Sequence, residues 1–232
     1  MRVYVILVSA LYLALVISCK KDEKKASVHS PNEIKKTLQS GADQTLFTML
    51  NPLESGIRFI NALTETPDMN GFFYEYYYNG AGVSVTDVNN DGLQDILFIS
   101  SLRKNQLYLN NGNLKFQDVT QESGLIQSSG YRTGVTNVDI NNDGFMDFYI
   151  SKSGKYDDPT KRKNELWVNH GPNQHGIPTF IEQATQYNLD IDMCSTQAAF
   201  FDYDLDGDLD MFLINHYTAP FDYKDINKLI KK

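Results

Sequence analysis

The sequence predicts an all-β protein: a partial β-propeller of four-stranded blades, of which about two and a half are present. Three observations predict this fold. An acidic nine-residue pattern occurs three times, short runs of strand-forming residues flank each copy, and the copies recur at roughly 50 to 60 residues, the length of a blade. The composition agrees, because 14 Tyr, 13 Phe and 15 Gly among 232 residues favour strands and tight turns.

The repeated pattern is Asp-x-Asp/Asn-x-Asp-Gly-x-x-Asp, and its copies begin at Asp87, Asp139 and Asp202. Oxygens at positions 1, 3, 5 and 9, with a backbone carbonyl at position 7, can surround a hard cation that needs six or more ligands. Glycine at position 6 permits the sharp turn. We therefore expect Ca²⁺ at up to three sites. Magnesium is the weaker expectation, because it requires a more rigid octahedron.

The candidate metal ligands are the residues at these positions of the three loops, together with a further acid in the third. They are Asp87, Asn89, Asp91, Leu93, Asp95, Asp139, Asn141, Asp143, Phe145, Asp147, Asp202, Asp204, Asp206, Asp208 and Asp210. Leu93 and Phe145 would contribute only their carbonyl oxygens. Repulsion among so many acids opposes folding without a cation.

An EF-hand is the obvious alternative, since its loop has a similar start. Its twelfth position carries a bidentate Glu within a helix. Here the twelfth positions are Phe98, Ile150 and Leu213, and the apolar runs around them are short and rich in strand formers. The sequence therefore favours a strand after each loop and excludes the EF-hand.

The flanking residues predict the strands of each blade, in chain order. The first two units have four predicted strands each, and the third has two. The expected ranges are 82–86, 96–100, 106–110 and 115–119, then 134–138, 148–151, 165–169 and 179–182, then 197–201 and 211–215.

These features resemble the FG-GAP or VCBS repeat, the calcium-loop propeller repeat of integrin α heads. The likeness rests on the loops, the Gly-Val strand starts, and Asn-x-Leu-Tyr-x-Asn followed by Phe-x-Asp-Val-Thr. Residues 77–82 and 195–202 are also similar to long Bacteroidetes lipoproteins that join FG-GAP repeats to a C-terminal ASPIC/UnbV-type domain. The resemblance implies calcium in the loops and further blades, or a second chain, to close the ring.

The N-terminal residues predict a lipoprotein. Arg2 precedes a fifteen-residue apolar run that suits a secretory signal, and Ser18-Cys19 resembles a lipobox. We expect a signal peptide over 1–18, lipidated Cys19 and a charged tether over 19–40, which resembles the export signal of outer-membrane surface lipoproteins. The propeller is expected over 41–221. The charged residues 222–232 are expected to be a truncated end.

Three smaller expectations concern segments outside the loops. Residues 47–50 followed by Ser55-Gly56 echo the end of the first blade and predict an isolated fourth strand. The aromatic run 72–78 predicts a strand at the propeller margin. A basic cluster is expected to form a solvated loop, and it comprises Lys152, Lys155, Lys161, Arg162 and Lys163.

Charge and motifs limit the function. The net charge of −8 and the pI near 4.9 disfavour nucleic-acid binding. No nucleophile elbow, phosphate loop or dinucleotide fingerprint is present, so no catalytic residue is assigned. We expect a non-enzymatic, membrane-anchored module that binds an extracellular protein or glycan. The alternative is a polysaccharide hydrolase or lyase in which calcium has a supporting role.

Overall fold

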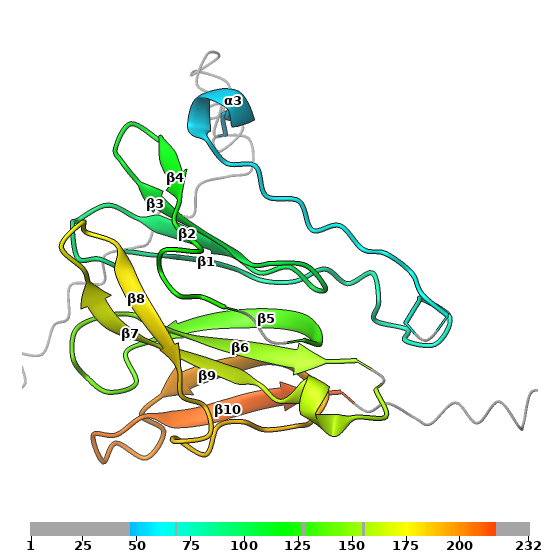
Figure 1. Cartoon of the computed structure of the whole chain (residues 1–232). Helices are drawn as coiled ribbons and strands as arrows, with labels where there is room; N and C mark the ends of the chain where they lie inside the picture. The colour runs from blue at the N-terminus through cyan, green and yellow to red at the C-terminus, as the bar shows by residue number, and fades with distance from the viewer. Residues whose placement is uncertain (1–46, 68, 127–128, 155, 217–232) are drawn as a thin grey trace, which may run out of the picture. The chain divides into compact units, whose positions relative to one another are not determined.

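A computed structural model describes residues 47–67, 69–126, 129–154 and 156–216 (Figure 1). The predicted signal peptide, Cys19, the tether to residue 40 and residues 222–232 lie outside this part. The elements in chain order are α3 (Pro52–Ser55), β1 (Val83–Thr86), β2 (Asp95–Phe98), β3 (Gln106–Asn110), β4 (Phe116–Asp118), β5 (Tyr131–Val138), β6 (Asp147–Ser153), the 3₁₀ helix η1 (Pro159–Arg162), β7 (Glu165–Pro172), β8 (Pro178–Glu182), β9 (Ser195–Phe201) and β10 (Asp210–Asn215).

The strands form antiparallel sheets that follow chain order. Blade 1 is β1-β2-β3-β4, blade 2 is β5-β6-β7-β8, and blade 3 is the pair β9-β10. The predicted all-β fold of partial propeller blades is confirmed. Each strand after a loop begins one residue earlier than expected, at the last aspartate of the loop, and the described strands close no barrel.

The first strands of the three blades lie next to one another, with β5 between β1 and β9. Glycine permits this close approach: a Cβ on Gly82 would lie 2.7 Å from the Val135 nitrogen, and one on Gly134 would lie 2.6 Å from the Thr196 carbonyl oxygen. The hydroxyl of Thr136 also donates a hydrogen bond to the Ala198 carbonyl oxygen, at 2.6 Å. The Gly-Val starts seen in the sequence are therefore contacts between blades.

Two apolar cores fill the spaces between blades. Side chains of blade 1, such as Leu97 and Leu107, pack against Phe148 and Trp167 of blade 2. The opposite face of blade 2 packs against blade 3 through a second cluster that includes Tyr149. Burial of these side chains accounts for most of the favourable free energy that holds the blades together.

The N-terminal segment that resembles the end of blade 1 in sequence does not form a strand. Residues 47–50 are irregular and α3 follows, so the predicted fourth strand there is wrong. The Ser-Gly part of the echo is structural, because Gly56 and Gly124 share a left-handed φ of 84° and 78°. Their Cα atoms face the carbonyl oxygens of Phe116 in β4 and Phe180 in β8, respectively. Each Ser-Gly turn thus lies against the last strand of the blade that follows it.

The aromatic run 72–78 is also not a strand: it forms successive turns. Its turns bury Tyr74 and Tyr77 against Tyr131 at the start of β5. The Tyr74 hydroxyl donates to Ser153 Oγ at 2.9 Å and lies 3.2 Å from His216 Nε2. This segment therefore joins blade 2 to the end of blade 3, far from the acidic loops along the strands.

The basic cluster does not behave as one solvated loop. Lys152 lies within β6, where it is buried and forms an ion pair of 3.2 Å with Glu165 of β7. Burial lowers the pKa of Lys152, while Glu165 opposes that shift. The sequence interpretation of Lys152 was wrong because Lys152 belongs to a strand whose residues on either side, Ser151 and Ser153, are also buried, and Glu165 of the next strand balances its charge. Among the described residues, no helix is long and apolar enough to cross a membrane.

Candidate metal loops

All three acidic loops adopt one backbone conformation. The residue at position 4 has a left-handed φ, 59° at Asn90, 56° at Asn142 and 64° at Leu205. The glycine at position 6 has a φ of 88° in loops one and two and 100° in loop three. Asn and Gly tolerate this region, whereas Leu adopts it at a cost. The repeat in the sequence is therefore a repeat in backbone geometry.

Hydrogen bonds within each loop turn the side-chain oxygens towards the backbone of the turn. In loop two, Asp139 accepts the N–H groups of Asp143 at 3.0 Å and Gly144 at 2.9 Å. Asp143 in turn accepts the N–H of Phe145, at 2.9 Å. Loop one repeats these bonds with Asp87, Asp91 and Leu93, and loop three with Asp202, Asp206 and Asp208.

In loops one and two, the asparagine at position 3 is hydrogen-bonded to the aspartate at position 5. The side-chain Nδ2 of Asn89 donates to Asp91 at 3.0 Å, and that of Asn141 donates to Asp143 at 2.9 Å. Positions 3 and 5 are therefore joined directly by their side chains in these two loops.

The aspartate at position 9 has a second role, since it begins the next strand. Asp147 is buried and accepts the N–H of Ile140 at 2.9 Å through one oxygen and that of Asn169 at 2.7 Å through the other. Asp95 makes the equivalent bonds in blade 1, including one from Asn110 at 2.8 Å. Burial raises the pKa of Asp95, and it raises the pKa of Asp147 to about 6.

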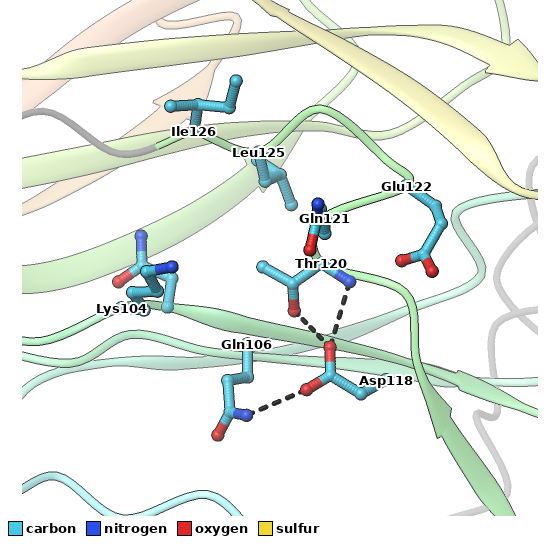
Figure 2. Close-up of a pocket in the computed structure, with 9 residues that line it drawn as sticks. Lys104, Gln106, Asp118, Thr120, Gln121, Glu122, Leu125 and Ile126 are labelled. Atoms are coloured by element: carbon cyan, nitrogen blue, oxygen red, sulfur yellow. Dashed lines mark hydrogen bonds between the residues drawn. The ribbon is translucent and has the colours of Figure 1, made fainter.

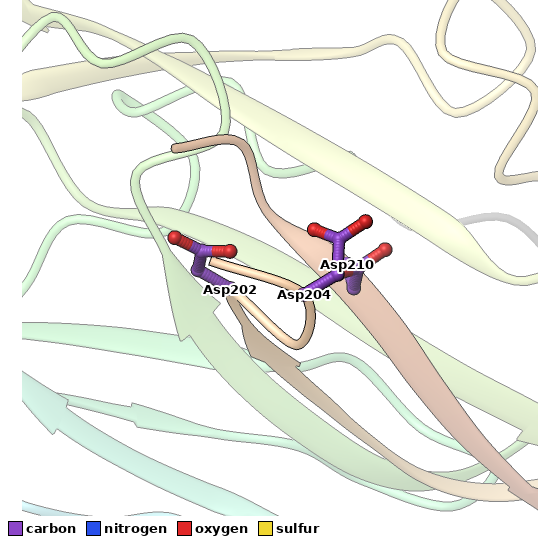
Figure 3. A group of neighbouring side chains, drawn as sticks. All are labelled: Asp202, Asp204 and Asp210. Carbon is purple, nitrogen blue, oxygen red and sulfur yellow. The ribbon is translucent and has the colours of Figure 1, made fainter. Parts of the chain in front are cut away.

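Loop three gathers the largest number of carboxylates. Ligand oxygens of Asp202, Asp204 and Asp210 all lie within 4.8 Å of one another (Figure 3). The predicted fifth acid, Asp208, lies against Asp206: their hydrogen bond lowers the pKa of Asp206 and raises that of Asp208. Unlike Asp147, Asp210 is exposed.

The donor set fits a calcium ion by its chemistry. Every side chain at positions 1, 3, 5 and 9 offers hard oxygen, and the loop adds a carbonyl at position 7. Within the described residues, the histidines join no cluster of three or more metal-ligating groups. The aspartates at positions 1 and 5 of each loop are held by backbone N–H donors of the same loop.

Sequence reasoning missed two residues next to these loops. Asn110 is the last residue of β3 and Asn169 lies within β7, and each donates its backbone N–H to the buried aspartate of its own blade. The side chain of Asn169 also donates to the Val88 carbonyl oxygen in blade 1, at 2.8 Å. The recurrence of Asn three residues after the shared leucine was the signal that could have identified them.

A separate hollow of about 700 Å³ lies at the far end of blade 1 (Figure 2). Asp118 is its central acid, and its oxygens accept Gln106 Nε2 at 2.9 Å and the N–H and hydroxyl of Thr120 at 3.0 and 2.5 Å. A carboxylate with these neighbours has a structural role in closing β4.

The sheets and loops together define a protein of propeller-type blades that carry acidic turns. A family comparison agrees, since the FG-GAP-like repeat matches residues 87–150, from the start of loop one to the middle of β6. No curated protein matches the chain. An FG-GAP-like repeat is therefore present in the region that joins blades 1 and 2.

Proposed function

We propose that this chain is a calcium-stabilised propeller module of a surface lipoprotein, which binds an extracellular protein or glycan without catalysing a reaction. The observation that carries the proposal is the conformational identity of the three acidic loops. Three turns that share one backbone conformation, in a chain with an FG-GAP-like repeat, support a common ligand of one chemistry.

Calcium would be held by the side chains at positions 1, 3, 5 and 9 and the carbonyls of Leu93, Phe145 and Asp208. It would offset the repulsion among these carboxylates and join the end of one strand to the start of the next. The backbone N–H groups of each loop would hold the aspartates at positions 1 and 5 in place in the absence of the ion.

Thermal unfolding of the whole chain tests the metal. Calcium at about a hundred times its dissociation constant should stabilise the fold by roughly 2.7 kcal/mol per independent site, relative to EDTA. Asp143→Ala should reduce this shift, whereas Asp157→Ala, an exposed acid outside the loops, should retain it. Equal calcium responses in the two variants would contradict the site assignment.

The lipid anchor and surface location rest on the lipobox at Cys19, outside the described residues. Metabolic labelling with a fatty acid should modify the chain and fail for Cys19→Ser. Binding to an extracellular glycan or protein array, with no turnover of the bound glycan, would support the module over the enzyme. Glycan cleavage abolished by one acidic substitution outside the loops would reverse that order.

A further inference from the structure

Two asparagine side chains connect loop one of blade 1 with loop two of blade 2. Asn90, at position 4 of loop one, donates its Nδ2 to the carbonyl oxygen of Gly144, at position 6 of loop two, over 3.1 Å. Asn169 of β7 donates its Nδ2 to the carbonyl oxygens of Val88 in loop one, at 2.8 Å, and Met146 in loop two, at 3.2 Å. The two loops are therefore hydrogen-bonded to each other directly and through a shared side chain.

The bond from Asn90 ends on a peptide group that also holds a candidate ligand of loop two. The peptide that carries the Gly144 carbonyl oxygen also carries the Phe145 N–H, which donates to Asp143 at 2.9 Å. Asn90 itself lies between the candidate ligands at positions 3 and 5 of loop one. Displacement of either turn would therefore break a bond next to the ligands of the other turn.

Asn169 is held firmly where it meets both loops. It is buried, its backbone N–H donates to Asp147 at 2.7 Å, and its Oδ1 accepts the N–H of Gly171 at 3.0 Å. Its side chain is therefore not free to follow one loop and leave the other. It reaches from position 2 of loop one to positions 8 and 9 of loop two.

The equivalent residues elsewhere in the repeat make no such connection. Asn110 repeats within blade 1 the bonds that Asn169 makes within blade 2, but in the described part of the chain its side chain bonds to no other blade. Asn142 has a left-handed φ of 56°, close to the 59° of Asn90, yet its side chain donates no hydrogen bond to another described residue. Both residues are therefore matched controls.

Two effects of opposite sign would link cation binding at the two loops. An ion in one loop neutralises acids that also attract an ion to the other, which weakens the second binding step. The aspartates at position 5 are exposed in both loops, so salt screens this effect beyond about 8 Å at physiological ionic strength. The hydrogen bonds act oppositely, because ordering one turn lowers the cost of ordering its neighbour.

We propose that loops one and two bind calcium as a cooperative pair, with Asn90 and Asn169 as the positioning residues that couple them. This coupling rests on the proposed function, since it requires an ion in each loop. Calcium at either loop fixes its turn, and the other loop then binds calcium about tenfold more tightly. That factor corresponds to about one or two hydrogen bonds of ordinary net strength.

Calorimetric titration of the whole chain with calcium measures the coupling. Asp206→Ala removes the contribution of loop three. In that background Asp143→Ala leaves only loop one and Asp91→Ala leaves only loop two. The coupling factor is the product of the two association constants when both loops are intact, divided by the product of the two single-loop constants. We expect a factor of about ten, which rises as added salt screens the opposing electrostatic effect.

Two matched pairs of variants test the asparagines. Asn90→Gly should lower the coupling factor by about threefold and Asn142→Gly should leave it unchanged, because glycine permits the left-handed φ at both positions. Asn169→Ala should also lower it by about threefold, whereas Asn110→Ala should not. A purely structural role would reduce stability in both members of a pair without changing the coupling factor of either.

The outcomes separate this coupling from the calcium sites themselves. A factor of one or less at both low and high salt would overturn the coupling and leave the sites in place. Equal changes in the two members of a pair would also overturn it. Absence of calcium binding by calorimetry and equilibrium dialysis would overturn the proposed function as well. Unaltered fluorescence of Trp167, the single tryptophan, would show that each variant is folded.

Discussion

Blades 2 and 3 contain the same acidic turn in different surroundings. The loop hydrogen bonds agree closely, yet Asp147 is buried next to β7, while Asp210 is exposed in a blade of which the described residues include two strands. The nine residues therefore set the conformation of the turn, because the bonds that positions 1 and 5 accept all come from the same loop. Burial of the last aspartate in blade 2 depends on β7, a strand outside the nine residues of the turn.

The largest effect should come from the apolar residue two positions after that aspartate. Tyr149→Ala should destabilise the chain by about 3–5 kcal/mol, because it opens a cavity between blades 2 and 3. Phe212→Ala should cost below about 1 kcal/mol, since that side chain is already mostly in water. Urea unfolding in EDTA would measure both changes. Similar losses would show that blade 3 is covered in solution.

The buried aspartate itself should give the next largest difference. Asp147→Ala leaves the N–H groups of Ile140 and Asn169 buried without acceptors, at a cost of about 2–3 kcal/mol. The loss of folding free energy is limited because burial of the ionised Asp147 carboxylate is itself unfavourable, as its raised pKa indicates. Asp210→Ala should change calcium-free stability much less. A larger effect at Asp210, measured by the same urea unfolding, would contradict the description of blade 3.

A smaller effect is expected from the anchor residue of β7. Asn169→Ala retains the backbone bond to Asp147 but removes the side-chain bond to Val88 in blade 1, so we expect a loss of about 1–2 kcal/mol. Asn79→Ala, at an exposed position in the bend before β1, serves as the control for general loss of an asparagine. Calorimetry should show a lower melting temperature for the first variant alone.

The smallest effect concerns strain in loop three. Leu205 has the left-handed φ that Asn90 and Asn142 adopt in the other loops. Leu205→Asn should stabilise blade 3 by about 0.5–1 kcal/mol, and Asn142→Leu should destabilise blade 2 by a similar amount. Thermal unfolding would detect opposite shifts. Shifts of the same sign would mean that backbone strain at position 4 is not the cause.

Much of the fold could be read from the chain because its signals are local. The acidic turns depend on residues within nine positions, and the strands beside them depend on short runs of apolar and β-branched residues. The four-stranded order of blades 1 and 2 followed from the repeat. The two strands predicted wrongly, at 47–50 and 72–78, lie outside the repeat, where no second copy constrained the interpretation.

The aromatic run 72–78 illustrates the limit. Its strand propensity predicted a strand, but the contacts that fix it are with Tyr131, Ser153 and His216, up to 142 residues away. Lys152 is a similar case, since its acid partner lies across a strand pair. Local sequence cannot specify which distant surface a segment will meet, and burial against that surface overrides propensity.

The sequence by itself determined the three acidic turns and the strands that follow them, because these depend on neighbours along the chain. Only the tertiary structure decided which of the equivalent aspartates is buried and which apolar residues fill the spaces between blades. These properties depend on strands that are distant in the sequence. Two copies of the same nine-residue pattern therefore have different environments in one molecule.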